Sequence, residues 1–75
     1  MIERGANSPA YMQLYRQLRG DILSGALPLG AKLPSKRTLA EELGLSLITV
    51  EHACALLADE GYIETRERSG AYVTS

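Results

Sequence analysis

The sequence contains one cysteine, Cys54, and has neither tryptophan nor phenylalanine. A single cysteine excludes a disulfide within the chain and a zinc site built from several thiolates. The apolar runs are short, which argues against a membrane-spanning helix and a signal peptide. We therefore expect a cytoplasmic protein without a membrane partner. Cys54 is expected to be a small buried core residue, with a redox switch as the alternative.

Patterns that support catalysis or metal binding are also missing. We find no nucleophile–base pair, no paired carboxylates suited to a shared pocket and no metal-ligand spacing. His52 has only weak candidate ligands three or four residues away, so it is not expected to bind a metal. The sequence predicts that this chain is not an enzyme and holds no metal or cofactor.

Neither sign of charge is in excess. Eight lysines and arginines oppose nine acidic residues, and the net charge is −1. That average is unfavourable for nucleic-acid binding, but such binding depends on a local basic patch rather than on the total. The 75 residues allow one small domain, and 45% hydrophobic with 23% charged residues is ordinary for a folded chain.

Residues 33–57 carry the pattern around which the rest is organised. Ser35 and Ser46 are good N-caps for two short helices, expected at 36–43 and 47–60. Gly44 lies where the first of these helices would need a left-handed residue to end. Each helix has an apolar stripe, formed by Leu39, Ala40 and Leu43, and by Val50, Ala53, Cys54 and Leu57. Two helices joined by a short glycine turn are typical of a helix-turn-helix, although the same hairpin also serves in plain packing.

A further helix is expected before this motif. Residues 1–7 have no periodicity and are interpreted as a flexible N-terminal arm. Ser8 and Pro9 then resemble a capping serine followed by proline in the first helical position. The helix is expected to end near Ser24–Gly25, with Gly20 permitting a close approach by another element. Its apolar face comprises Tyr11, Leu14, Tyr15, Leu18 and Ile22. The two tyrosines are interpreted as packing residues, with stacking on bases as the alternative.

After Gly61 the pattern changes to β-prone runs at 62–66 and 71–74, with a glycine-containing turn at 67–70. Three helices followed by a β-hairpin are the order of a winged helix. The sequence therefore predicts an α+β fold, a winged helix-turn-helix domain over residues 8–75 with a hairpin wing at 62–74. Lys32-Leu33 could add a short third strand.

Basic residues gather on two elements that should flank the second helix of the motif. Lys36 and Arg37 lie in the first turn after Ser35, where the positive end of the helix opposes them and would favour an anion. With Lys32 before this helix and Arg66 and Arg68 in the hairpin, five of the eight basic residues are accounted for. The alternative interpretation is a solvated surface of mixed charge.

The helix at 47–60 is unusual because no lysine or arginine lies between Leu45 and Gly61. Opposite its apolar stripe, at 100° per residue, lie Ile48, Glu51, His52 and Ala55, with Thr49 to one side. We hypothesise that Ile48 packs on a thymine methyl group and that Glu51 or His52 bonds a base edge. Ser46 and Thr49 would bond phosphate or base edges.

Many spaced matches occur in one order and cover nearly the whole chain, from about Ser8 to Thr74. Beginning with Gln13-Leu14-Tyr15-Arg16-Gln17-Leu18 and Ile22-Leu23-Ser24-Gly25, they continue with Pro34–Ala40, Gly44–Val50, Leu57–Ile63 and Ser69–Val73. With these segments the sequence resembles the N-terminal winged-helix domain of bacterial GntR-type transcription regulators. The stretch Pro34–Arg37 with Glu51 and 61–63 is similar to the MocR-like branch of that family.

The resemblance implies residue roles. The arginine matching Arg37 contacts DNA in the family, Ser46 and Thr49 match residues that touch the backbone or bases, and Gly70 matches the glycine of a wing tip that enters the minor groove. The sequence also departs from the family, with Leu47 and Glu51 where many members have arginine and Arg68 in place of the first wing glycine. In the MocR-like branch a linker and an aminotransferase-like domain that binds pyridoxal phosphate follow, and that effector domain is not in these residues.

Together these observations predict sequence-specific binding to a double-stranded DNA operator, with helix 47–60 in the major groove and hairpin 62–74 as the wing. The full-length protein is expected to be a homodimer. The alternative is a winged-helix module that binds protein instead, suggested by the uncharged start of helix 47–60. The candidate DNA-binding residues are Lys32, Ser35, Lys36, Arg37, Ser46, Leu47, Ile48, Thr49, Glu51, His52, Arg66, Arg68, Ser69 and Gly70.

Overall fold

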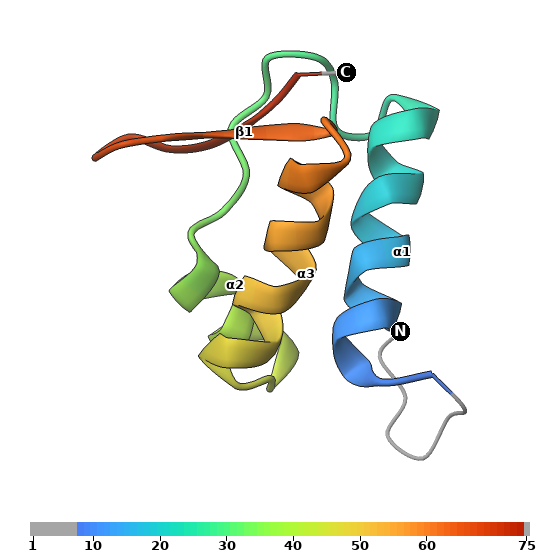
Figure 1. The fold of residues 1–75 in the computed structure, drawn as a ribbon, viewed down its shortest axis with the longest axis vertical. Coiled ribbons are helices and arrows are strands. Elements are labelled where there is room, and N and C mark those ends of the chain that lie inside the picture. Colours follow the sequence, from blue (N-terminus) through green and yellow to red (C-terminus); the bar gives the residue numbers. More distant parts are fainter. Residues whose placement is uncertain (1–7, 75) are drawn as a thin grey trace.

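The computed structural model describes residues 8–74 and confirms the predicted order of three helices followed by a hairpin (Figure 1). The elements are α1 (Ala10–Ser24), α2 (Lys36–Leu43), α3 (Leu47–Asp59), β1 (Ile63–Arg66) and β2 (Gly70–Val73). The prediction of an N-terminal arm at 1–7 lies outside the described residues.

α1 begins one residue later than the sequence suggested. Pro9 has φ −58° and ψ 155°, so it is the non-helical N-cap and not the first helical residue. Its carbonyl accepts hydrogen bonds from the N–H groups of Met12 and Gln13, both at 3.1 Å. The prediction of Ser8 as a capping side chain was wrong, because Ser8 is moved outward and its hydroxyl accepts from Arg16 at 2.9 Å. At the other end Gly25, with φ 88°, closes the helix as predicted.

Within residues 8–74, no other element packs closely against Gly20 of α1. A Cβ atom added there would have nothing within 4 Å outside the helix itself. The expectation that another element packs against this glycine was therefore wrong.

The helix-turn-helix forms as its capping residues predicted. The Ser35 hydroxyl accepts from the Thr38 N–H at 3.0 Å, and the Ser46 hydroxyl accepts from the Thr49 N–H at 3.1 Å. Gly44 is left-handed with φ 67° and ends α2 at the predicted residue. α3 ends at Asp59 and not at the predicted residue 60, because Glu60 already forms the cap with φ −89° and ψ 0°.

The hairpin is antiparallel, with Ile63 opposite Val73 and Arg66 opposite Gly70. We call residues 63–73 the wing; they begin one residue after the predicted 62 and end one before the predicted 74. The predicted third strand is reduced to a single bridge between Lys32 and Tyr72. Backbone bonds on both sides of this bridge, Leu33 N–H to Ala71 O at 2.8 Å and Val73 N–H to Ala31 O at 2.9 Å, hold the segment before α2 against β2.

One apolar core holds these elements together. α1 and α3 lie side by side and run in the same direction, α2 lies across the start of α3, and the wing projects past the helices (Figure 1). Burial of apolar surface among them is the main stabilising contribution. The core comprises Leu14, Tyr15, Leu18, Ile22, Leu33, Leu39, Ala40, Val50, Ala53, Cys54, Leu57, Ile63 and Val73. This packing confirms the predicted apolar stripes and leaves the outer side of α3 open.

Candidate nucleic-acid interface

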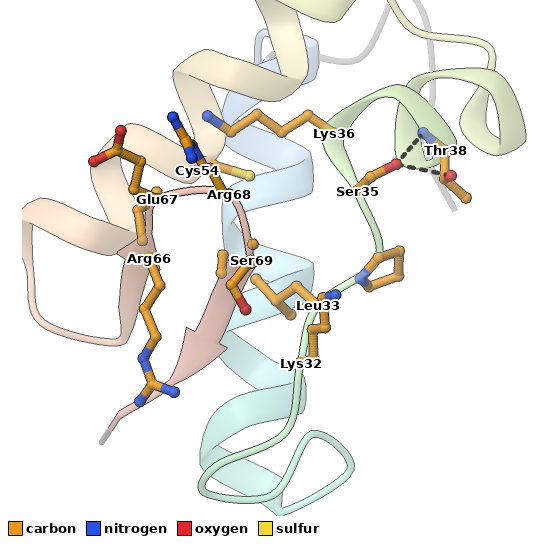
Figure 2. A pocket seen from close by; sticks show the side chains of 14 residues that line it. Lys32, Leu33, Ser35, Lys36, Thr38, Cys54, Arg66, Glu67, Arg68 and Ser69 are labelled. Carbon is orange, nitrogen blue, oxygen red and sulfur yellow. Dashed lines mark hydrogen bonds between the residues drawn. The ribbon is translucent and has the colours of Figure 1, made fainter.

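A cleft of about 600 Å³ lies between the wing and the start of α2 (Figure 2). We call it the wing cleft. Four of the five predicted cations line it: Lys32 and Lys36 from one side, and Arg66 and Arg68 from the other. The fifth, Arg37, lies in a separate shallow hollow with Leu47. The structure therefore brings together basic residues from two segments that are thirty or more positions apart in the chain.

The N-cap of α2 fixes the position of Lys36. Ser35 accepts from the Thr38 N–H and donates to the Thr38 hydroxyl at 2.8 Å, which holds the first turn of the helix. Lys36 follows directly and reaches across the cleft toward the wing (Figure 2). Among residues 8–74, none of Lys32, Lys36 and Arg68 forms an ion pair. These three side chains gather positive charge at one place; Glu67 also lines the cleft but forms no ion pair with them.

Arg66 differs from these three. Its Nε donates to the Glu64 carboxylate at 2.9 Å, and its guanidinium lies 4.3 Å from the centre of the Tyr72 ring. Both charged side chains are about half exposed, at 55% and 54%, so the pair is weak but reduces the free charge. Sequence reasoning treated Arg66 as a free cation and missed both contacts. Side chains two positions apart on a strand share a face, so alternation along the strand was a signal for Glu64. The Tyr72 contact needs the hairpin register to be known.

The wing tip has an unusual backbone. Arg68 has φ 64°, a left-handed conformation that costs a residue with a Cβ about 1 kcal/mol or more. The predicted positive-φ glycine, Gly70, has φ 128°. A Cβ at Gly70 would lie 2.9 Å from Cε of Lys32, whose side chain crosses the wing there. The hydroxyl groups of Ser69 and Tyr72 are hydrogen-bonded to each other and brace the turn.

α3 presents a face free of lysine and arginine. Ile48 is 77% exposed and Leu47 is 40% exposed, both in the first turn. Ile48, Glu51, His52 and Ala55 are all exposed, as the helical spacing predicted, and we call them the recognition face. The hydroxyl of Ser46 donates to that of Thr49 at 2.8 Å, so both groups are held at the N-terminus of α3.

His52 is not a free side chain on this face. Its ring stacks on Tyr11 of α1, with centroids 3.7 Å apart and planes at 8°. Sequence reasoning favoured Tyr11 as a packing residue over one that stacks on bases, and it does lie half-buried beside the core. The helical spacing gives no signal for the stack, because the pairing depends on how α1 and α3 lie against each other.

Cys54 lies on the inner side of the wing cleft and is 5% exposed, which confirms the core interpretation. Burial raises the pKa of its thiol, Lys36 lowers that pKa and Glu51 raises it. Because a thiol is reactive as the thiolate, this environment suppresses its reactivity.

The other residue with a shifted pKa lies away from the cleft. The Tyr15 hydroxyl donates to the Glu60 carboxylate, and this bond raises the pKa of Tyr15, with burial adding and Arg19 opposing. The contact joins α1 to the end of α3 and is part of the framework of the fold.

Among residues 8–74, no group of histidine, cysteine and acidic side chains could hold a metal ion. Within the same residues, no helix is long and apolar enough to cross a membrane.

Comparison with known proteins identifies relatives along the whole chain. Residues 10–73 match the family described as bacterial regulatory proteins, gntR family. The helix-turn-helix transcriptional regulator YdeL of Bacillus subtilis is 46% identical over 69 residues, which are 92% of this chain and 15% of YdeL. MocR of Rhizobium meliloti, a probable rhizopine catabolism regulatory protein, is 41% identical over 75 residues, which are 100% of this chain and 15% of MocR.

Among solved structures, YtrA of Sulfolobus acidocaldarius, a GntR-family transcription factor, superimposes with a TM-score of 0.94 at 39% identity. The match covers 100% of this chain and 79% of that chain. The chain therefore spans a small part of YdeL and MocR and most of the YtrA structure. On this evidence the chain belongs to the GntR family of regulatory proteins and has its winged helix-turn-helix fold.

Proposed function

We propose that this chain binds an operator in double-stranded DNA sequence-specifically, as the winged helix-turn-helix domain of a transcription regulator. The observation that carries the proposal is the wing cleft, where Lys32, Lys36 and Arg68 converge without forming an ion pair among residues 8–74, and where Glu67 is the one acidic residue of the lining. Phosphate groups of DNA are the natural counterions for such a site. Membership of a family of regulators supports the same function.

The phosphate contacts would come from both sides of the cleft. Lys36 lies at the N-terminus of α2, where free N–H groups and the helix dipole also favour an anion. Arg68 and Lys32 would follow the strand as it passes the wing, with Ser69 and Gly70 at the tip near the minor groove. Arg37, outside the cleft, would contact the backbone on the other side of α3. These contacts position the protein but carry no sequence information.

Sequence reading would fall to α3 in the major groove. Ile48 is the most exposed large apolar side chain in the described residues and fits a thymine methyl group. Glu51 can accept from cytosine N4, and His52 can bond a base edge. Ser46 and Thr49, at the N-terminus of α3, would contact phosphate, and Leu47 would line the entry to the groove.

The regulator as a whole would be a homodimer on two half-sites about 34 Å apart. Dimerisation and effector binding would lie in further residues of the regulator. Of the effector domains found in this family, the resemblance to the MocR-like branch favours one that binds pyridoxal phosphate.

A second candidate function is binding to another protein through the start of α3. The exposed pair of Leu47 at 40% and Ile48 at 77% favours it, because this surface is apolar and Glu51 next to it is acidic.

Fluorescence anisotropy with a labelled random-sequence duplex, at low and at moderate salt, separates the two functions. The variant carries Lys36→Gln, Arg37→Gln, Arg66→Gln and Arg68→Gln. A control with Arg16→Gln and Arg19→Gln removes positive charge from α1 instead.

We expect salt-sensitive binding by the wild type and the control, and loss of binding by the variant. Unchanged binding by a folded variant would refute the DNA-binding proposal. No binding by the wild-type chain, even when it is fused to a dimerising coiled coil, would favour the protein-binding alternative.

A further inference from the structure

The stack between Tyr11 and His52 joins α1 to the recognition face. The ring centroids are 3.7 Å apart and the planes are inclined by 8°, so the rings are nearly parallel and in contact. Tyr11 is half-buried beside the core, whereas His52 is exposed on α3. A residue near the start of α1 thus touches a side chain that helical spacing places opposite the core.

This contact restricts the imidazole. An exposed histidine on a helix normally samples several side-chain rotamers. Here one face of the ring is covered by Tyr11, whose own position is set by α1, and α1 is held against α3 by the buried Leu14 and Val50. The imidazole edge, which carries the nitrogen atoms, is the part of His52 left to make polar contacts.

His52 also occupies a useful position along α3. It lies one helical turn after Ile48, on the same face and directly after Glu51. Lysine and arginine are the usual donors to the N7 and O6 acceptors of a purine, and this face has neither. The imidazole N–H of His52 is the side-chain donor that can take their place. A fixed donor loses less entropy on binding than a mobile one.

We propose that Tyr11 is a positioning residue for DNA recognition: it holds the His52 imidazole so that a ring N–H donates to N7 or O6 of a purine in the major groove. The inference rests on the proposed function and extends the recognition surface from α3 to α1. Tyr11 itself acts through His52 and makes no base contact.

The stack can be tested first without DNA. In the NMR spectrum of the wild-type chain, the ring current of Tyr11 should shift the carbon-bound imidazole protons of His52 upfield. Tyr11→Phe should keep that shift and Tyr11→Ala should remove it. Imidazole shifts equal in the wild type and in a folded Tyr11→Ala variant would overturn the proposal.

The role in recognition is tested with two duplexes, one enriched by the wild-type chain from a random-sequence pool and the unselected pool itself. Tyr11→Ala should weaken binding to the enriched duplex by about threefold to tenfold, the usual effect of an aromatic pair, and leave binding to the pool unchanged. Tyr11→Phe should retain the preference. In a His52→Ala background, Tyr11→Ala should have no further effect, because the two residues act as one unit.

Met12→Ala is the matched control, because Met12 is also half-buried on α1 and packs against the core. It should lower thermal stability without changing the preference for the enriched duplex. If Tyr11→Ala leaves the preference intact, or if its effect adds fully to that of His52→Ala, Tyr11 does not position His52. Failure of the wild-type chain to bind either duplex, even when it is fused to a dimerising coiled coil, would instead refute the proposed function, whatever the NMR result.

Discussion

At the residue scale, the most informative position is Arg68. Its backbone is left-handed with φ 64°, and its side chain lines the wing cleft. Glycine would adopt this conformation without strain, so the arginine is retained at a cost in stability. That cost is consistent with a side chain selected for binding.

Arg68→Gly should therefore stabilise the fold and weaken DNA binding together. We expect a gain of about 0.5 to 1 kcal/mol in the free energy of unfolding, measured in urea, since relief of the left-handed strain exceeds the added entropy of the unfolded chain. Glu67→Gly is the control, because Glu67 does not have a positive φ and the same change should destabilise. A stability loss in Arg68→Gly would mean that its side-chain contacts outweigh the strain.

Cys54 gives a prediction about reactivity. Burial raises the pKa of its thiol, so the thiolate should be scarce in the folded chain near neutral pH. A thiol reagent should label Cys54 only at the rate of unfolding, and adding urea should accelerate labelling. Because the pKa is raised on folding, the associated stability is present below the unfolded pKa and is lost as pH rises toward the folded value. Fast labelling of the native chain would support the redox alternative.

Not every residue-level feature could be predicted. Capping by Ser35 and Ser46 follows from local chemistry and is confirmed. The Tyr72 contact of Arg66 and the Tyr11 contact of His52 could not be predicted, because each partner belongs to another element and depends on the hairpin register or on the packing of α1. Glu64 lies two residues before Arg66 on the same strand, so the sequence alone could have suggested that pair. Local sequence also placed Ser8 one residue too close to the helix, since Pro9 takes the N-cap conformation.

At the element scale, α2 and its turn into α3 were predicted to the residue, because a capping serine and a left-handed glycine mark both ends. The third strand could not be settled in the same way. It pairs Lys32 with Tyr72, which lie forty positions apart. A single bridge is too short to produce the alternation of apolar and polar residues by which a strand is predicted. The two helices that carry the site could therefore be predicted from the sequence. The cleft, which depends on the pairing of Lys32 with Tyr72, could not.

α1 provides a prediction of its own, because Gly20 is exposed within the helix and has open space around it. Gly20→Ala should stabilise the chain by about 1 kcal/mol through helix propensity. Thermal or urea unfolding measures the change. The same substitution at Gly44, where φ is 67°, should destabilise instead, which makes it the control. A loss of stability in Gly20→Ala would indicate that the glycine has a role in α1 beyond its conformation.

At the scale of the whole molecule, the net charge of −1 conceals an uneven distribution. Lys32, Lys36, Arg66 and Arg68 line the wing cleft, where Glu67 is the one acidic residue of the described lining, while Glu51 and Glu64 lie on elements beside it. This arrangement makes the electrostatic part of binding local. If each subunit of a dimer contributes four to five phosphate contacts, log K should fall against log salt with a slope of roughly −7 to −9.

The salt dependence of DNA binding, compared between the wild-type chain and the double variant Lys36→Gln/Arg68→Gln, tests whether DNA binds at the wing cleft. Each phosphate contact contributes about 0.9 to the slope, so losing two per chain should make the variant's slope shallower by about 1.8 for each bound chain, or about 3.6 for a dimer. The control Arg16→Gln/Arg19→Gln should keep the wild-type slope. Equal slopes for the wild type and the folded double variant would show that DNA does not bind at the wing cleft.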